Sequence, residues 1–399
     1  MNEAMSGVVE PVIAVINTSA LRQALERRKR KINCYPRGKT NPDSLQIPAE
    51  WCKFQNGDPF IFHDSGAEDS GRFIILSSLF MLEKLVYGRT IAMDGTFKTR
   101  PRKWEQVFVI HVLINNRFVP AVSVIMAKRS RASYLSVLQQ LREIMEGRFQ
   151  VVWSPTLILT DFELAQRSAI LNHFPVARHR CCYFHFAQAM QRWIQKVKLD
   201  QKYRTDVLFN EYIGLFRALA FMSSAICGGE IRQRNGLSWH CKTWIIKEDG
   251  TSPRFLIDIW NHSAEAMAGN PTTTCALQAW HRSINAATRE RSHSMWKCLK
   301  LFKTEIGVIS RNLCIQASSF SVPERSASKV QRQKQERLQQ SIRTFSGTDL
   351  ISGLQKITRT LRNLEGETGE SQRQAAMAQE EMNNGGSIGN TRRRRSRNP

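Results

Sequence analysis

Two aspartates occupy positions at which a carboxylate can do chemistry. Asp94 lies within Arg89–Thr99 (RTIAMDGTFKT), whose alternating pattern predicts a strand, and Asp161 follows the apolar run of PTLILTDF. A carboxylate inside a strand is costly to bury without a positive partner, so Asp94 either lies at a rim, pairs with Arg89 or Lys98, or forms a site with the second acid. Two such acids can share divalent metal ions, and ligation by oxygen alone suits Mg²⁺. Ions about 3.5–4 Å apart stabilise the attacking and leaving oxygens of a phosphodiester displacement.

A cysteine and a histidine form a second candidate site. Cys182 and His185, in CYFH, have a spacing that supplies half of a zinc site. His240, Cys241 and His281 are the candidates that would complete it. The alternative is structural, with a buried thiol and a hydrogen-bonded core histidine.

Basic residues follow Asp94 closely. Lys98, Arg100, Arg102 and Lys103 are predicted to contact DNA phosphates, as is Arg282 further along the chain. Trp104 is predicted to stack on a base. The alternative for each residue is a solvated, charged turn.

The composition indicates a globular protein with a polyanionic partner. The chain has 399 residues, of which 42% are hydrophobic, and its 58 Lys and Arg against 34 Asp and Glu give a net charge of +24. Such an excess of positive charge repels itself in a compact protein, so a polyanionic partner is expected. Nucleic acid is the first candidate for this partner, and an anionic membrane surface is the second. The remaining alternative is a basic soluble protein that has no such partner.

The cysteine count and the hydropathy predict a soluble intracellular protein. The 9 cysteines are odd in number and scattered, as expected of reduced thiols. The N-terminus lacks the pattern of a secretory signal. No apolar run approaches the length of about 18 residues that a membrane span requires, so no membrane association is predicted.

The central region is predicted to be an α/β layer with a mixed sheet. The strand at Arg89–Thr99 and strands over 105–114 and 118–127 form a three-stranded antiparallel meander. Helices and strands then alternate, over 133–146 (helix), 155–162 (strand), 164–174 (helix) and 176–184 (strand). This order places Asp94 and Asp161 on neighbouring strands in the ribonuclease-H-like arrangement.

The flanking regions add helices and polar tails. Short strands at 60–62 and 72–76 and a helix at 79–87 precede the centre; helices at 186–199, 211–222, 252–260, 264–268 and 274–287 follow it, with surface helices at 330–340 and 354–366. The run Arg27–Lys31 is a nuclear address, a phosphate contact or a solvated helix face. Beyond Glu365 the polar chain, ending in the run Arg392–Arg395, is predicted to be disordered.

These patterns divide the chain into six parts. They are a basic N-terminal segment (1–46), an αβ lead-in (47–88), the ribonuclease-H-like core (89–185), two helical segments (186–270 and 271–320) and a polar basic tail, partly disordered (321–399). The family resemblance described next implies that 186–270 is an all-helical insertion before the last helix of the core, and that 271–320 contains this core helix with the third-acid position.

Five motifs make the chain resemble the Mutator-like element (MULE) transposases. They stand in the family's order at comparable spacings and are MDGTFKTRP, LILTDFELA, CYFHFAQA, WNHSAEAMAGNP and AWHRSINA. The likeness covers about Ile47–Lys303. It implies that Asp94 and Asp161 are the first two members of an Asp/Asp/Glu (DDE) triad that binds Mg²⁺.

The third acid is where the chain departs from the family. The resemblance places a glutamate just before the last motif's Trp-His, and Gln278 stands there. A glutamine offers a neutral amide oxygen in place of a bidentate carboxylate, which weakens metal binding. Glu265 and Glu290 are too far along the chain to replace it by one helical turn. The triad is therefore predicted to be impaired.

The leading hypothesis is a MULE-type DDE transposase protein of the nucleus that binds transposon ends and target DNA. If it is active, the reaction is Mg²⁺-dependent strand cleavage and transfer, and the sequence also allows a homo-oligomer. The alternative is a non-catalytic DNA-binding regulator, domesticated or decayed, on the same fold. A third hypothesis is a helical scaffold whose basic tails bind RNA.

Overall fold

The computed structural model describes residues 35–36, 39–223, 243–244, 252–288, 294–318, 326–344 and 349–362. The chain forms two compact units. Unit 1 comprises Met1–Pro155, Leu164–Val176 and Leu277–Ser318; unit 2 comprises Thr156–Glu163, Ala177–Ala276 and Ser319–Pro399. The six-part division expected from the sequence stays a prediction.

Five strands, each antiparallel to its neighbours, belong to unit 1 and follow the order β1-β2-β5-β4-β3. They are β1 (Ile61–Asp64), β2 (Phe73–Leu76), β3 (Thr90–Thr96), β4 (Gln106–Ile114) and β5 (Arg117–Met126). The meander predicted from the alternating runs is confirmed, because β4 pairs with β3 on one side and with β5 on the other. The long apolar strands thus place β3, and with it Asp94, beside β4.

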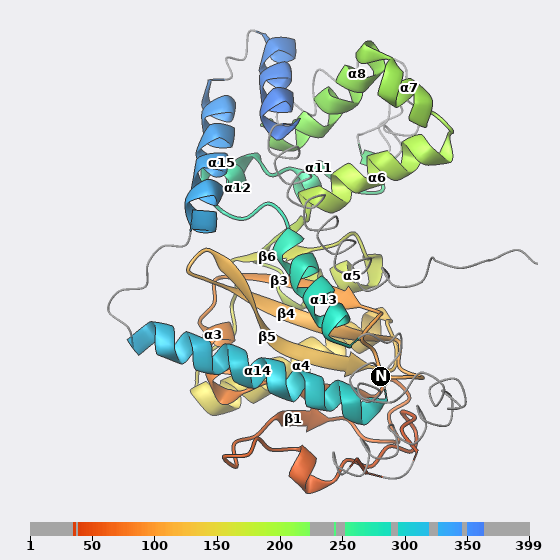
Figure 1. The fold of residues 1–399 in the computed structure, drawn as a ribbon, viewed down its shortest axis with the longest axis vertical. Helices are drawn as coiled ribbons and strands as arrows, with labels where there is room; N and C mark the ends of the chain where they lie inside the picture. The colour runs from red at the N-terminus through yellow and green to blue at the C-terminus, as the bar shows by residue number, and fades with distance from the viewer. Residues whose placement is uncertain are drawn as a thin grey trace, which may run out of the picture. The chain divides into compact units, whose positions relative to one another are not determined.

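Helices cover both faces of this sheet because the side chains of each strand alternate between them. On β4, Val107 and Val109 join the core cluster of Phe302 on α14 (Met295–Ser318), which lies in front of the strands in Figure 1. Phe108 points the other way and packs edge to face on Tyr134 of α4, with ring centroids 5.2 Å apart. Unit 1 also contains η2 (Ala49–Trp51), α3 (Leu79–Val86), α4 (Arg131–Phe149), α5 (Leu164–His173) and most of α13 (Cys275–Thr288).

Local signals explain the limits of α4, the longest helix predicted for the centre. The Ser130 side chain accepts a hydrogen bond from the Ser133 N–H and caps the start. Gln150, at φ 54°, ends the helix in the left-handed conformation. Between them Tyr134, Leu138 and other predicted core residues are buried, while Leu135 is only half-buried.

Unit 2 contains a parallel strand pair and a helical region. The strands are β6 (Leu157–Thr160) and β7 (Arg178–Cys181). The described helices are α6 (Tyr183–Lys196), α7 (Asp200–Thr205), α8 (Val207–Ala218), η3 (Leu219–Phe221), α11 (Ile257–Trp260), α12 (Ser263–Met267), α15 (Ser326–Arg343) and a helix over 350–362. Aromatic rings fill its core, where Phe186 stacks on Trp260 with centroids 5.0 Å apart.

The α/β class is confirmed, with antiparallel and parallel strands both present. Two element predictions were wrong at their ends. The strand expected over 176–184 stops at Cys181, because Tyr183 already begins α6; the helix expected over 252–260 is helical only over Ile257–Trp260. The helix at 350–362 is not a simple surface helix, since Leu354, Ile357 and Leu361 belong to the core of unit 2. The ribonuclease-H-like detail stays a prediction.

Within the described residues, no helix combines the length and the apolar character needed to cross a membrane. The basic runs Arg27–Lys31 and Arg392–Arg395 lie outside the described residues.

Candidate functional site

Asp94 is buried in the middle of β3, and its carboxylate is held in one orientation. The residue is 8% exposed, and its Oδ1 accepts a hydrogen bond of 2.8 Å from the Gly95 N–H. Gly95 is required here, because a Cβ at this position would lie 2.5 Å from Oε1 of Gln106. The Gln106 amide cannot easily withdraw, since its Nε2 donates to the Tyr134 hydroxyl at 2.8 Å. The Asp-Gly dipeptide therefore packs β3 tightly at the point where the acid sits.

A histidine from α13 faces this acid. His281 Nδ1 lies 3.5 Å from Asp94 Oδ2, and the His281 side chain is 10% exposed. Burial lowers the pKa of His281 from 6.5 to about 4, so the imidazole is neutral at neutral pH. The distance exceeds that of a good hydrogen bond. His281, which the sequence offered as a possible completion of the Cys182/His185 site, thus lies beside the acid.

A second buried histidine, which sequence reasoning missed, lies behind the first. His111 on β4 is paired with Ala92 in the antiparallel ladder, which puts it on the same sheet face as Asp94. Its ring lies 6.2 Å from that of His281 and 5.3 Å from that of Trp280, centroid to centroid. Burial lowers its pKa well below 6.5. The only available signal was a histidine within the apolar run QVFVIHVLI.

Trp280 fixes α13 against its neighbour α14. Its Nε1–H donates to Glu305 Oε1 at 2.9 Å. Trp280 also packs against the apolar cluster that contains Phe302. The aromatic and histidine residues of AWHRSINA thus hold the helix that carries Gln278 and His281 over the face of β3 and β4.

Asp161 directly follows β6, as predicted, and begins the turn into α5. Its Oδ1 accepts from the Glu163 N–H at 2.9 Å, and its carbonyl oxygen accepts from the Thr160 hydroxyl at 2.8 Å. Asp161 is half-buried and belongs to unit 2, whereas Asp94 belongs to unit 1. The pairing of the two acids stays a prediction.

Gln278 lies on α13 one turn before His281 and is half-buried. Its amide oxygen, like the carboxylate oxygens of the two aspartates, is a donor of the type that Mg²⁺ prefers, and a shared site of the three residues stays a prediction. Within the described residues, no group of three or more His, Cys, Asp or Glu side chains is placed to hold a metal ion. A Mg²⁺ site does not need one, because Mg²⁺ is commonly bound through one or two carboxylates plus substrate phosphates.

The basic residues predicted to bind DNA are mostly open to solvent. Lys98, Arg102 and Lys103 are exposed in the segment between β3 and β4, and Arg282 is exposed on α13. Arg100 is half-buried, and its Nη1 donates to the carbonyl oxygen of Trp104. Lys98, Arg102 and Lys103 thus follow the strand of Asp94 with their side chains open to solvent, and their contact with DNA phosphates stays a prediction.

The prediction that Trp104 stacks on a base is wrong. The residue is 1% exposed and its Nε1–H donates to the Thr40 carbonyl oxygen at 3.1 Å. Its indole belongs to the apolar cluster between the sheet and α14. An aromatic residue after a run of charges looks like a nucleic-acid contact in the sequence, but its large apolar area is better stabilised in the core.

Cys182 and His185 are both held within unit 2. Cys182 Sγ accepts from the Thr274 N–H at 3.1 Å, and burial raises the pKa of its thiol to about 11. Burial, with a smaller contribution from Arg192, lowers the pKa of His185 to about 4. His281 belongs to unit 1, and His240 and Cys241 lie outside the described residues. Zinc binding stays a prediction.

The WNHSAEAMAGNP motif braces unit 2 through buried polar contacts. Asn261 Nδ2 donates to the Met222 carbonyl oxygen at 2.6 Å, and His262 Nε2 lies 2.8 Å from the Cys181 carbonyl oxygen. Glu265 is 1% exposed and pairs with Arg180 at 3.1 Å and Arg178 at 3.5 Å. The polar residues of this motif are therefore structural partners of β7 and η3.

Residues 90–189, which run from β3 into α6, match the family model of the MULE transposase domain. The chain carries a MULE transposase domain. The matched segment includes Asp94, Asp161 and the Cys182/His185 pair, and ends before Gln278. A transposase-type function and DNA binding in general follow from this domain. No curated protein matches the chain.

Proposed function

We propose that this MULE domain protein is a DDE-type DNA transposase by descent, with Asp94 and Asp161 as metal ligands and Gln278 in the third-acid position. The observation that carries the proposal is the buried carboxylate of Asp94, fixed by the Gly95 N–H within the matched segment. Burying a carboxylate costs free energy because the group loses its contact with water. A functional role explains why such a group is kept in the strand better than a surface role does. The proposed scaffold is the ribonuclease-H-like sheet.

Mg²⁺ is the metal that this oxygen donor set would hold, and it would stabilise the attacking and leaving oxygens of a phosphodiester displacement. The chain's own residues prepare the site. The Gly95 N–H holds one carboxylate oxygen of Asp94, and the neutral ring of His281 faces the other. The exposed cations of the segment after β3 would bind the DNA backbone and bring the phosphodiester to the acids. After cleavage, the freed 3′-hydroxyl would attack target DNA, with no covalent protein intermediate.

Gln278 favours a second candidate function, a non-catalytic DNA-binding regulator on the same fold. An amide oxygen lacks the charge that a glutamate brings to a cation site, and the protein's net charge of +24 disfavours cation binding further. DNA binding needs only the basic surface and survives this loss. In either role we place the protein in the nucleus, where its DNA partner is; a homo-oligomer would be the state that joins two DNA ends.

The experiment that tests the transposase proposal uses the full chain and three variants, Asp94→Asn, Gln278→Glu and the exposed control Glu143→Gln. Nicking of supercoiled plasmid is measured with Mg²⁺ or Mn²⁺. We expect Gln278→Glu to nick at least about tenfold faster than the parent protein, since one added ligand is worth more than about 1.4 kcal/mol. Asp94→Asn should abolish nicking, and Glu143→Gln should leave it unchanged.

Metal binding measured by calorimetry provides a readout besides activity. Gln278→Glu should bind Mn²⁺ more tightly than the parent protein and Asp94→Asn more weakly. DNA affinity should fall steeply with salt in every variant, because it depends on the cations rather than on the acids. Tight, salt-dependent DNA binding with no nicking by the parent protein or by Gln278→Glu would favour the regulator and reject the transposase.

A further inference from the structure

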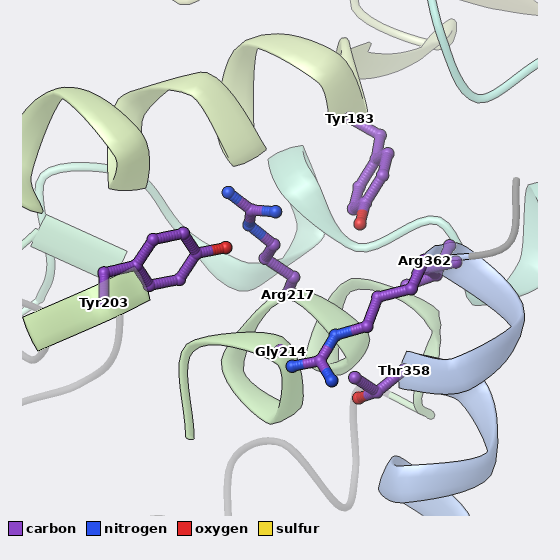
Figure 2. A pocket seen from close by; sticks show the side chains of 7 residues that line it. Tyr183, Tyr203, Gly214, Arg217, Thr358 and Arg362 are labelled. Atoms are coloured by element: carbon purple, nitrogen blue, oxygen red, sulfur yellow. The ribbon is translucent and has the colours of Figure 1, made fainter. Parts of the chain in front are cut away.

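Unit 2 contains a pocket lined by cationic and hydroxyl side chains that is separate from the acids described above. Its lining residues come from four helices and are Tyr183, Tyr203, Gly214, Arg217, Thr358, Leu361 and Arg362. Figure 2 shows the hydroxyl of Tyr203 pointing toward the Arg217 guanidinium and the side chain of Arg362 reaching across from the helix at 350–362 toward Gly214. Two guanidinium groups and two phenol groups line the pocket, and none of its lining residues is acidic.

The two arginines reach the pocket from helices that are distant in sequence. Gly214 and Arg217 lie on the same face of α8. Thr358, Leu361 and Arg362 share one face of the helix at 350–362. A Cβ on Gly214 would lie 2.5 Å from Cγ2 of Thr358 and 3.0 Å from Nη2 of Arg362. The glycine therefore permits the close approach of helices that places both guanidinium groups at one pocket.

Arg362 is held in position before any ligand arrives. Its Nη2 donates to the carbonyl oxygen of Asn210 at 3.0 Å and to the Asn210 side-chain oxygen at 2.6 Å. The Asn210 Nδ2 in turn donates to the Tyr203 carbonyl oxygen at 3.0 Å, which ties α7 to the same network. The Nε and Nη1 atoms of Arg362 carry three further N–H donors. A preorganised guanidinium costs less entropy on binding than a mobile one.

The floor of the pocket is formed by residues whose side chains already take part in the packing and hydrogen bonds of unit 2. Leu361 and Tyr183 belong to the core cluster of unit 2, and the Thr358 hydroxyl is engaged with the Leu354 carbonyl oxygen at 2.8 Å. The nearby acid Glu211 accepts from the Gln355 amide at 2.7 Å. The hollow is small, with a volume of about 50 Å³. This is below the usual size of a pocket for a whole ligand and suits one anionic group rather than a whole nucleotide cofactor.

We propose that this pocket binds a phosphate group through Arg217, Arg362 and the hydroxyl of Tyr203. Planar guanidinium forks match the oxygens of a phosphate, and hydrogen bonds between charged groups are about twice as strong as neutral ones. The group belongs either to a DNA backbone or to a free nucleotide, and both present the same oxygens. The proposal is independent of metal binding at Asp94, because it concerns another unit and requires no divalent cation.

The test uses the full chain in EDTA with Arg217→Gln, Arg362→Gln and the control Arg343→Gln, which removes the same charge from an exposed site on α15. The dissociation constant of inorganic phosphate is measured by calorimetry. We expect each pocket variant to lose about tenfold or more in affinity, the value for losing a hydrogen bond to a charged group, and the control to change less than about twofold.

Two further measurements decide whether the phosphate group belongs to DNA or to a free nucleotide. If it is DNA, the slope of log affinity against log salt for a short duplex should fall by about 1 in each pocket variant and not in Arg343→Gln. If it is a nucleotide, AMP should displace inorganic phosphate and the DNA slope should not change. No measurable phosphate binding by the parent protein, or an equal loss in the control, would overturn the proposal.

Tyr203→Phe covers the case in which an arginine variant does not fold. It removes one hydroxyl and leaves the ring and the helix α7 in place. Its phosphate affinity should fall severalfold while its circular dichroism spectrum matches that of the parent protein. An unchanged phosphate affinity of Tyr203→Phe would contradict phosphate binding in this pocket, even if both arginine variants misfolded.

Discussion

Each unit contains a buried carboxylate, and the two carboxylates lie beside different kinds of side chain. In unit 2, Glu265 is 1% exposed and lies between two guanidinium groups, with Arg180 at 3.1 Å and Arg178 at 3.5 Å. In unit 1, Asp94 is 8% exposed and faces His281, whose pKa burial lowers to about 4. The first acid is paired with two arginines, and the second lies beside an imidazole that carries no charge at neutral pH.

This difference separates a structural acid from one that is suited to a cation. A carboxylate already balanced by two arginines gains little from a metal ion and loses much when its partners are removed. The two arginines give Glu265 a structural role, and Asp94 stays the predicted metal ligand.

The largest effect should come from replacing Glu265. Glu265→Gln should lower the free energy of unfolding by about 3 kcal/mol, because Arg180 then remains largely buried without its ion pair. Asp94→Asn should cost less than about 1 kcal/mol, since its amide oxygen still accepts from Gly95 and His281 is neutral. Urea denaturation followed by tryptophan fluorescence measures both. The exposed Glu336→Gln on α15 is the control, and equal losses at Glu265 and Asp94 would remove the distinction between the units.

The pH dependence of unit 2 should reveal its buried neutral histidine. Burial is the main cause that lowers the pKa of His262 from 6.5 to about 3. Between these values the unfolded chain binds a proton that the folded chain does not, so stability is present above pH 6.5 and is lost as pH falls toward 3. The slope from this residue is about 1 kcal/mol per pH unit. His262→Gln should flatten the acid limb of a stability–pH curve measured in urea; an unchanged curve would show that His262 is not the group responsible.

A glycine substitution tests how rigidly unit 1 holds its acid. Gly95→Ala should cost about 1–3 kcal/mol, because the new methyl group would meet Gln106 Oε1 at 2.5 Å. Gly147→Ala is the matched control. Gly147 lies within α4 with nothing within 4 Å of its Cβ position, so alanine should add about 0.5–1 kcal/mol of stability. Thermal unfolding measures both, and a neutral Gly95→Ala would mean that the strand around Asp94 adapts easily.

Much of the central architecture could be predicted because it depends on local pattern. The alternating strands β3, β4 and β5 and the amphipathic helix α4 were located to within a few residues from hydrophobic periodicity. The end of β7 was misjudged, since Tyr183 and Phe184 have strand-like side chains but belong to α6. Local preference is weaker than the packing of Tyr183 against Phe221, whose ring lies 4.8 Å away.

The sequence by itself determined that Asp94 lies in a strand, that Asp161 directly follows the apolar run of PTLILTDF, and that the chain resembles the MULE transposases, because periodicity and motif order are properties of neighbouring residues. Only the tertiary structure decided that His281 faces Asp94, that Trp104 is buried, and that Glu265 pairs with Arg178 and Arg180. Each of these contacts joins residues far apart in the chain, and its partner is chosen by the packing of whole helices on a sheet, which no local pattern specifies.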